Sequence, residues 1–397
     1  MSDSIFNRRK FVIAAAATAG VLPSLSTVSG AVGRTTKRYK KKLVVLGTES
    51  DWVFQDNNHQ SVVQVINLES FDHSQHVIPV PNAHSIVLAG KSIVCLPQHH
   101  NQFYVTNSLF DSGKVMNAPK GWELSGHGIY DLSEDRIVLT IRKKSRKTSN
   151  GGIALYDKDF KLISLIPLEG TDPHDVSIHP NLKKVAISYY GNSEYSDEFS
   201  SLADSKIEWR SLKNFNKISD VNFKQGSITH ITLADNGDTF GVVRNSYPYT
   251  KDGFKLLEQK QLGQVVGLLD KIAGKILLPS YMVKWDGKRA IQILKPDQAI
   301  RGPQSIIHLE NSDKVVSAWP FSQHVAVYDT GRDKWQIIRP ELSGIAFPRG
   351  VADLGDGKTI AISDQFNGIA LFNLKKNIRT AFLPISTFYN RHIYTIV

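Results

Sequence analysis

The sequence predicts an all-β protein, a seven-bladed β-propeller made of four-stranded antiparallel blades. From residue 43 onward, short runs rich in Val, Ile, Leu and Tyr alternate with polar residues, which is typical of strands. A strand–turn–strand unit recurs about every 45 residues, and this period is typical of propeller repeats. Helical periodicity sustained over 12 or more residues is scarce.

The repeated unit explains how each blade is built. The turns read AGKS, DNGD, NSDK and GDGK, where Asn, Asp and Gly tolerate left-handed backbone angles. A further strand–turn–strand such as GGIALYDKDFKLISLI follows several copies, so each repeat supplies about four strands. One unit cannot bury both its faces alone, so neighbouring units must stack. The seven copies begin at His84, His127, His174, Thr229, Val265, Gln304 and Arg349.

The two ends of the predicted domain, residues 43–397, are expected to share a blade. The first strand lies in KKLVVLGTES, and the C-terminal TAFLPISTFYNRHIYTIV is its candidate partner. Pairing these two segments closes the ring and removes two exposed sheet edges. We expect a single domain and a monomer.

Residues 1–31 have the three-part layout of an export signal. Arg8, Arg9 and Lys10 precede Phe11 and an Ala-rich apolar run, and small residues follow as far as Ala31. The segment resembles a twin-arginine signal, which implies a periplasmic protein. Residues 32–42 form a basic flexible leader. The apolar run is shorter than the roughly 20 residues of a membrane span, and we expect none after cleavage.

The net charge of +11 is concentrated at the N-terminus. Residues 1–42 hold nine Lys or Arg and one Asp, so eight of the eleven net charges lie there. The remaining chain is close to neutral, and we therefore expect no nucleic-acid partner.

Three histidines start successive repeats, at a position that faces the central channel of a propeller. His84, His127 and His174 occupy this position and are the candidate metal ligands. His230 is one residue out of register and is expected to face away, because side chains alternate across a strand. His179 lies at a turn and is expected at the surface.

A polar, aromatic and cationic collar is expected around these histidines, at the ends of the second strands and at other channel positions. Converging polar groups in one concave place are what a ligand site needs. The candidate ligand-binding residues are Arg349, Gln304, Arg142, Arg244, Tyr189 and Trp319.

These residues leave three functions open. Three imidazoles with an open position suit a transition metal such as Fe or Cu. The same funnel suits an enzyme, a lactonase-like hydrolase or a cofactor-dependent oxidoreductase with His127 or His174 as base and Arg349 stabilising an anion. The third function is a protein-interaction scaffold. The motifs GxGxxG, HExxH, CxxC and GxSxG are absent, so no residue is assigned a catalytic role.

The segment 125–192 resembles a family of uncharacterised bacterial proteins. The matching motifs are Gly126-His127-Gly128, Gly152–Asp157 and Pro173-His174-Asp175. Members are exported by the twin-arginine route and are found beside imelysin-type iron-uptake and di-haem peroxidase-like proteins. The resemblance implies a propeller with an accessory role in periplasmic metal acquisition, of iron above all, with imelysin-type partners. The basic run IRKKSRK departs from the acidic or Asn-containing strand end that is frequent in the family.

Overall fold

The structure is a computed structural model, and the residues that it describes belong to the unit 37–397. The structure describes residues 41–48, 60–143, 150–179, 181–191, 205–223, 227–244, 280–293, 303–365, 367–386 and 392–396. The predicted signal 1–31 and most of the leader 32–42 lie outside these residues, as does the repeat copy starting at Val265. Among the described residues, no helix has the length and apolar character to cross a membrane.

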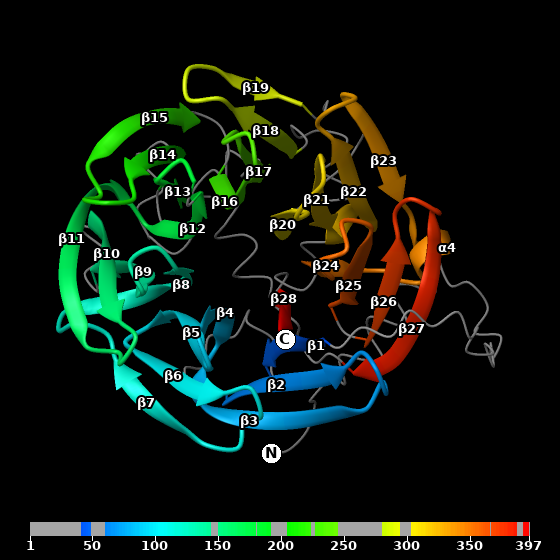
Figure 1. The fold of residues 1–397 in the computed structure, drawn as a ribbon, viewed down its shortest axis with the longest axis horizontal. Helices are drawn as coiled ribbons and strands as arrows, with labels where there is room; N and C mark the ends of the chain where they lie inside the picture. Colours follow the sequence, from blue (N-terminus) through cyan, green and yellow to red (C-terminus); the bar gives the residue numbers. More distant parts are fainter. Residues whose placement is uncertain are drawn as a thin grey trace, which may run out of the picture. The chain divides into compact units, whose positions relative to one another are not determined.

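The unit consists of antiparallel sheets, most of them four-stranded, arranged around a central axis (Figure 1). The sheet that joins the two ends of the chain has the order β28-β1-β2-β3. Its strands are β28 (His392–Ile396), β1 (Lys42–Thr48), β2 (Gln60–Asn67) and β3 (His73–Pro81).

The next sheet is eight-stranded and contains two four-stranded meanders. They are joined where β5 pairs with β8, at Gln98↔Ser125 and His100↔Leu124. The first meander is β4 (Ala83–Ala89), β5 (Ser92–His100), β6 (Gln102–Asn107) and β7 (Gly113–Asn117); the second is β8 (Trp122–Asp131), β9 (Arg136–Lys143), β10 (Asn150–Asp157) and β11 (Leu162–Thr171).

The remaining described strands form four further four-stranded meanders. The first consists of β12 (Pro173–His179), β13 (Lys184–Tyr189), β14 (Ser205–Ser211) and β15 (Lys217–Phe223), and the second of β16 (Ser227–Leu233), β17 (Thr239–Arg244), β18 (Tyr281–Trp285) and β19 (Ala290–Gln292). The third consists of β20 (Ser305–His308), β21 (Lys314–Trp319), β22 (His324–Asp329) and β23 (Lys334–Ile338). The fourth consists of β24 (Pro348–Asp353), β25 (Thr359–Asp364), β26 (Asn367–Asn373) and β27 (Ile378–Ser386). Two short helical turns, η5 (Pro320–Ser322) and α4 (Pro340–Ser343), complete the described elements.

Burial decreases from the axis outward, as stacked sheets require. The second strand β13 is buried along its whole length, whereas the outermost strands β11 and β15 alternate between exposed and partly buried residues. A strand that is covered on both faces reads as a continuous apolar run, and an outer strand with one wet face alternates. Figure 1 shows the last strand of each meander on the outside of the ring.

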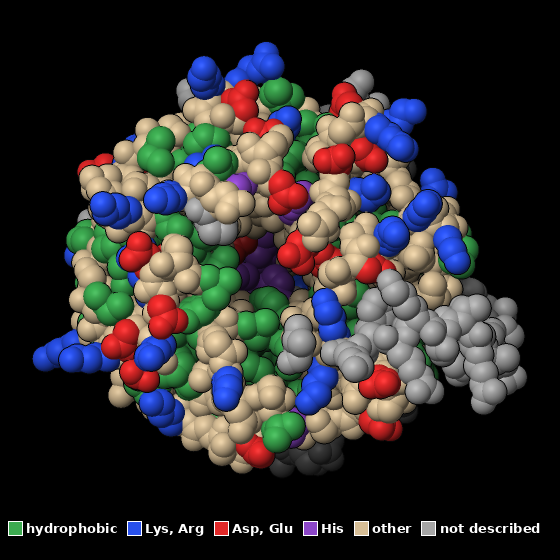
Figure 2. All heavy atoms as spheres, viewed as in Figure 1, with side chains coloured by type: hydrophobic (Ala, Val, Ile, Leu, Met, Phe, Trp, Pro, Cys, Tyr) green, Lys and Arg blue, Asp and Glu red, His purple; other side chains and the backbone are tan. Residues whose placement is uncertain are grey.

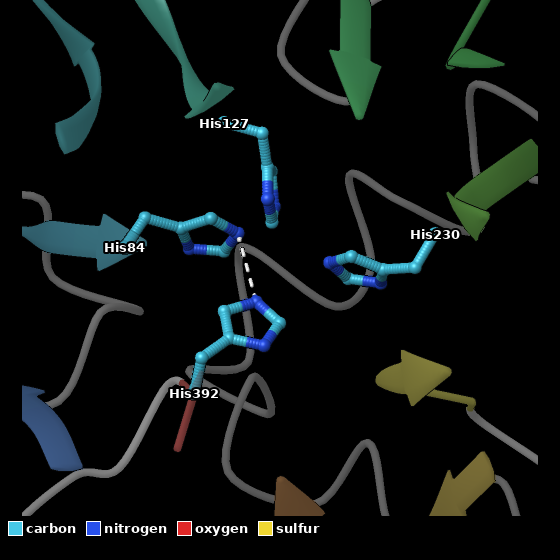
Figure 3. Close-up of side chains that lie close together, drawn as sticks. All are labelled: His84, His127, His230 and His392. Carbon is cyan, nitrogen blue, oxygen red and sulfur yellow. Dashed lines mark hydrogen bonds between the residues drawn. The ribbon is translucent and has the colours of Figure 1, made fainter. Parts of the chain in front are cut away.

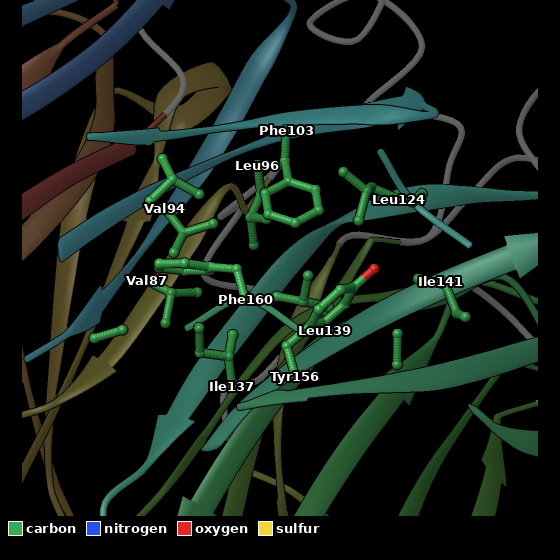
Figure 4. Close-up of a cluster of buried hydrophobic side chains, with 14 residues drawn as sticks. Val87, Val94, Leu96, Phe103, Leu124, Ile137, Leu139, Ile141, Tyr156 and Phe160 are labelled. Carbon is green, nitrogen blue, oxygen red and sulfur yellow. The ribbon is translucent and has the colours of Figure 1, made fainter. Parts of the chain in front are cut away.

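Apolar side chains from neighbouring meanders form the cores. One cluster joins Val94, Leu96 and Phe103 of β5 and β6 to Leu139 and Tyr156 of β9 and β10 (Figure 4). Because each meander presents apolar residues to both neighbours, the ring is held together by a series of such clusters.

The predicted pairing of the first and last strands is confirmed. β1 pairs antiparallel with β28 from Lys42↔Ile396 to Leu46↔His392. Ile393 of β28 packs in a core cluster with Val45 of β1 and Ala352 of β24. β28 therefore takes the innermost place of its sheet, nearest the axis (Figure 1).

Replacing Ile393 by Ala is expected to lower the free energy of unfolding by about 2–5 kcal/mol, because the lost side chain leaves a cavity at the ring closure. Urea unfolding followed by tryptophan fluorescence measures the change. Ile378→Ala, on the outer strand β27 where the side chain is 49% exposed, is the matched control and is expected to change stability by less than about 0.5 kcal/mol. Equal effects of the two substitutions would contradict the packing described here.

Candidate functional site

Four histidines from four different strands meet on the axis. They are His84 of β4, His127 of β8, His230 of β16 and His392 of β28. One ring nitrogen of each lies within 4.8 Å of the others, and all four side chains are buried. Figure 3 shows the four rings pointing toward one another.

Irregularities in strand pairing lie at His84, His127 and His230. β4 shifts register between Ala83 and Ser85, which brackets His84, and β8 shifts between Leu124 and Gly128, which brackets His127. A bulge leaves a residue unpaired and redirects its side chain. Gly126 has φ of +108°, and a Cβ there would lie 3.0 Å from the His84 ring, so glycine allows the close approach of β8 to His84.

The predicted outward orientation of His230 is wrong, and a bulge is the reason. The pairing of β16 with β17 shifts between Ile228 and His230, so Thr229 is the extra residue. This extra residue changes the alternation of side chains along β16. His230 therefore faces the axis, in the position that strict alternation gives to Thr229.

His392 was not among the residues predicted for the site. The sequence predicts only that the C-terminal strand closes the ring. In the structure this strand, β28, is also the innermost strand of its sheet. The signal was present in HIYTIV, a histidine at the start of an alternating strand, as at His84.

The repeat copy that starts at Val265 is not needed to complete the unit that begins at β16. The strands β16, β17, β18 and β19 already form a four-stranded sheet without it.

His174 lies against the cluster, but its two ring nitrogens have other partners. Its ring centroid is 4.6 Å from that of His127 and 5.1 Å from that of His230. Nδ1 lies 3.1 Å from the Ser125 carbonyl oxygen, and Nε2 lies 2.9 Å from the Tyr190 hydroxyl. A neutral ring that donates from Nδ1 accepts at Nε2. We therefore place His174 beside the ligand group rather than within it.

Asp175 contacts the cluster through His127. Its Oδ1 lies 3.4 Å from His127 Nδ1, while Oδ2 accepts a hydrogen bond from the Ile231 backbone N–H at 3.0 Å. His127 Nε2 is buried and has no hydrogen-bond partner among the described residues. With the ring proton on Nδ1, the lone pair of Nε2 is available to a metal ion.

Burial keeps the imidazoles of His127 and His174 neutral. Desolvation lowers the pKa of His127 to about 3. Desolvation, together with the charges of neighbouring histidines, places the pKa of His174 well below its ordinary value. Burial also raises the pKa of Asp175 to about 7, against the opposing effect of two backbone N–H groups. Neutral imidazole is the form that binds metals, so His127 does not need to lose a proton first.

The spacing suits a small tetrahedral ion. Zinc–nitrogen bonds of about 2.0–2.1 Å imply nitrogen–nitrogen edges of about 3.4 Å in a tetrahedron. His84 Nε2 and His392 Nε2 are 3.4 Å apart, and no pair of ligand atoms in the group exceeds 4.8 Å.

The axis is open toward one face of the ring. Figure 2 shows this face hollowed at its centre, with histidine side chains inside the hollow and acidic side chains on part of its rim. A groove of about 490 Å³ has Ile86, Ile129 and Tyr394 in its wall. Each of these residues follows a clustered histidine by two positions on the same strand, so the groove runs alongside the site.

Arg142 belongs to a buried ion-pair network rather than to an open anion site. Its guanidinium lies 3.3 Å from Glu123 and 3.6 Å from Asp172, and His99 lies 3.8 Å from Asp172. Burial alone would raise the pKa of Asp172, but the hydrogen bond and charge of His99 and the charge of Arg142 lower it. The positive charge of Arg142 is thus already balanced by carboxylates.

Two other collar candidates are core residues. Tyr189 is fully buried in the cluster of β9, β10 and β13, and Trp319 is fully buried beside Ser317. Consecutive side chains on a strand point to opposite faces, which is why Tyr190 and not Tyr189 reaches His174.

The last collar candidates lie on or next to strands without a clustered histidine. Gln304, just before β20, and Arg349, in β24, are both buried. The side chain of Arg244 lies outside the described part of the chain. His179 is buried rather than at the surface, because its ring contacts the Asp235 carbonyl at 2.9 Å.

Comparison with known proteins places the fold only. No known family profile matches the sequence, and no curated protein sequence matches it. A chain of the hydrazine synthase of Kuenenia stuttgartiensis is similar in structure, with a TM-score of 0.56 and 9% identity over 81% of this chain and 89% of that one.

Two further solved structures cover 90% of this chain and 98% of their own. AztD from Citrobacter koseri has a TM-score of 0.48 at 10% identity, and a chain of a nidogen/laminin complex has 0.49 at 8%. The comparison and the sheet topology together show an all-β, propeller-like fold of antiparallel four-stranded units.

Proposed function

We propose that this protein is a periplasmic seven-bladed propeller that binds one transition-metal ion at His84, His127, His230 and His392. The observation that carries the proposal is the convergence of four ligand nitrogens, from four strands far apart in sequence, within 4.8 Å of one another. Among the described strands, the five four-stranded sheets together with the eight-stranded sheet, taken as two blades, support a count of seven.

The chemistry of the donors supports a metal cargo. Imidazole nitrogens suit Zn, Cu, Fe and Ni, and the clustered side chains are buried, which keeps competing water away. Within the described residues His127 Nε2 has no hydrogen-bond partner, and Asp175 lies near His127 Nδ1 and provides the carboxylate that accompanies many metal-bound histidines.

The closed ligand set favours binding over turnover. A catalytic metal keeps an open position for water or substrate, whereas four protein ligands complete a tetrahedron. We therefore favour an accessory role in metal acquisition over an enzyme. The resemblance of residues 125–192 to exported proteins supports the periplasmic location, the preference for iron and an imelysin-type partner.

Protein purified without an affinity tag and stripped of metal is expected to bind one equivalent of Co²⁺ or Zn²⁺. His127→Ala and His392→Ala are each expected to weaken this binding strongly, because either change removes one of four ligands and opens a coordination position to water and chelators. Elemental analysis and the visible absorption of Co²⁺ measure it. His73→Ala, on the exposed outer strand β3, is the control and should bind as wild type does. Undiminished uptake by the first two variants would refute the proposal.

The ligand set is tested by exchanging single histidines for glutamine. His230→Gln is expected to lose the intense Co²⁺ absorption of a tetrahedral site, while His174→Gln is expected to keep one equivalent, because the His174 nitrogens already contact Ser125 and Tyr190. The opposite result would favour the ligand set His84, His127 and His174.

In the metal-free protein, the contribution of His127 to stability is expected to fall as the pH drops from 6.5 toward 3, while Asp175, whose pKa burial raises to about 7, acts in the opposite sense above about pH 4. An unfolded histidine takes up a proton near pH 6.5, but burial holds the pKa of His127 at about 3, so the unfolded state binds more protons in this window. The free energy of unfolding should fall by about 1.4 kcal/mol per pH unit for each such histidine. Urea unfolding at several pH values measures this slope, which should be shallower in His127→Asn and unchanged in His73→Ala.

A further inference from the structure

We infer that Asp175 is a positioning residue that holds two of the ligands, His127 and His230, in place for one metal ion. The inference rests on the proposed function, and it assigns a role to β12. This strand supplies no ligand to the four-histidine group, yet it packs against both β8 and β16, which supply one each.

The first contact fixes the ring of His127. Asp175 Oδ1 lies 3.4 Å from Nδ1 of His127, the ring nitrogen other than Nε2. A carboxylate in this position selects the tautomer that carries the proton on Nδ1, and it makes Nε2 a stronger donor to a metal. Nε2 of His127 is buried and has no hydrogen-bond partner among the residues that the structure describes.

The second contact fixes the backbone next to His230. Asp175 Oδ2 accepts the backbone N–H of Ile231 at 3.0 Å, from the sheet on the other side. Ile231 directly follows His230, at the end of the bulge that turns the imidazole toward the axis. The carboxylate therefore holds the bulge that gives His230 its orientation.

Asp175 is itself held firmly. Its backbone N–H donates to Ser188 Oγ at 3.1 Å, and its Oδ1 also accepts the Val176 backbone N–H at 2.8 Å. It lies within the irregular stretch of β12 between Pro173 and Val176. The Asp175 backbone is held by Ser188, and its two carboxylate oxygens accept hydrogen bonds from Val176 in its own sheet and from Ile231 in the neighbouring sheet.

An asparagine cannot replace this arrangement. Its side chain has one acceptor oxygen and one NH₂ donor, so it can accept from Ile231 or from His127, but not from both through separate oxygens. The NH₂ group would face a donor on one side, either the ring N–H or the backbone N–H.

The test compares Asp175→Asn with Asp172→Asn, the same change at a buried carboxylate three residues away that contacts His99 and Arg142. We expect Asp175→Asn to bind Zn²⁺ about 10–100-fold more weakly and to alter the Co²⁺ absorption spectrum. Asp172→Asn should match wild type in both. The melting temperature of each metal-free variant shows whether the substitution destabilises the protein in general. General destabilisation would lower the melting temperature but leave the Co²⁺ spectrum unchanged.

A measurement on the wild type covers the case in which Asp175→Asn does not fold. In protein labelled with ¹⁵N-histidine and loaded with Zn²⁺, His127 should coordinate through Nε2 and keep a proton on Nδ1. Coordination through Nδ1 would overturn the inference, as would equal affinities of the two Asn variants. If the wild type binds no metal at all, the proposed function fails; if it binds and only these results are absent, the inference alone fails.

Discussion

The desolvation of clustered imidazoles is the constraint on which the axial site depends. A charged imidazolium in this interior would meet other imidazoles at centroid distances near 5 Å, without water to screen it. The cluster is therefore compatible with the fold only when its rings are neutral, and each needs partners for its nitrogens. His174 has such partners in Ser125 and Tyr190, whereas His127 Nε2 is buried and has no hydrogen-bond partner in the part of the chain that the structure describes.

The radial stacking of sheets makes this concentration of side chains possible. The innermost strands start near the axis, and irregular pairing at their first residues releases side chains from the normal alternation. The apolar clusters between neighbouring meanders hold those strands at fixed separations. The site is thus a product of packing across several sheets, and no single meander contains it.

Much of this arrangement could be predicted from the sequence, because strand alternation and turn residues are local signals. They identified the strand–turn–strand units, the closing pair β1–β28 and the axial position of His84 and His127. A β-bulge is not a local signal, since it depends on what the neighbouring strand pairs with. The rule of strict alternation therefore predicts the wrong orientation for the His230 side chain. His392 lies outside the seven repeat copies, so the repeats alone do not identify it.

The position of His392 in the sequence has a consequence for biosynthesis. Its nitrogen meets that of His84, 308 residues earlier in the chain. Because a ribosome makes the chain from its N-terminus, the first three histidines of the group emerge well before the fourth. A growing polypeptide thus lacks a complete coordination sphere until residue 392 has been added, which delays full metal capture until nearly all of the ring has been translated.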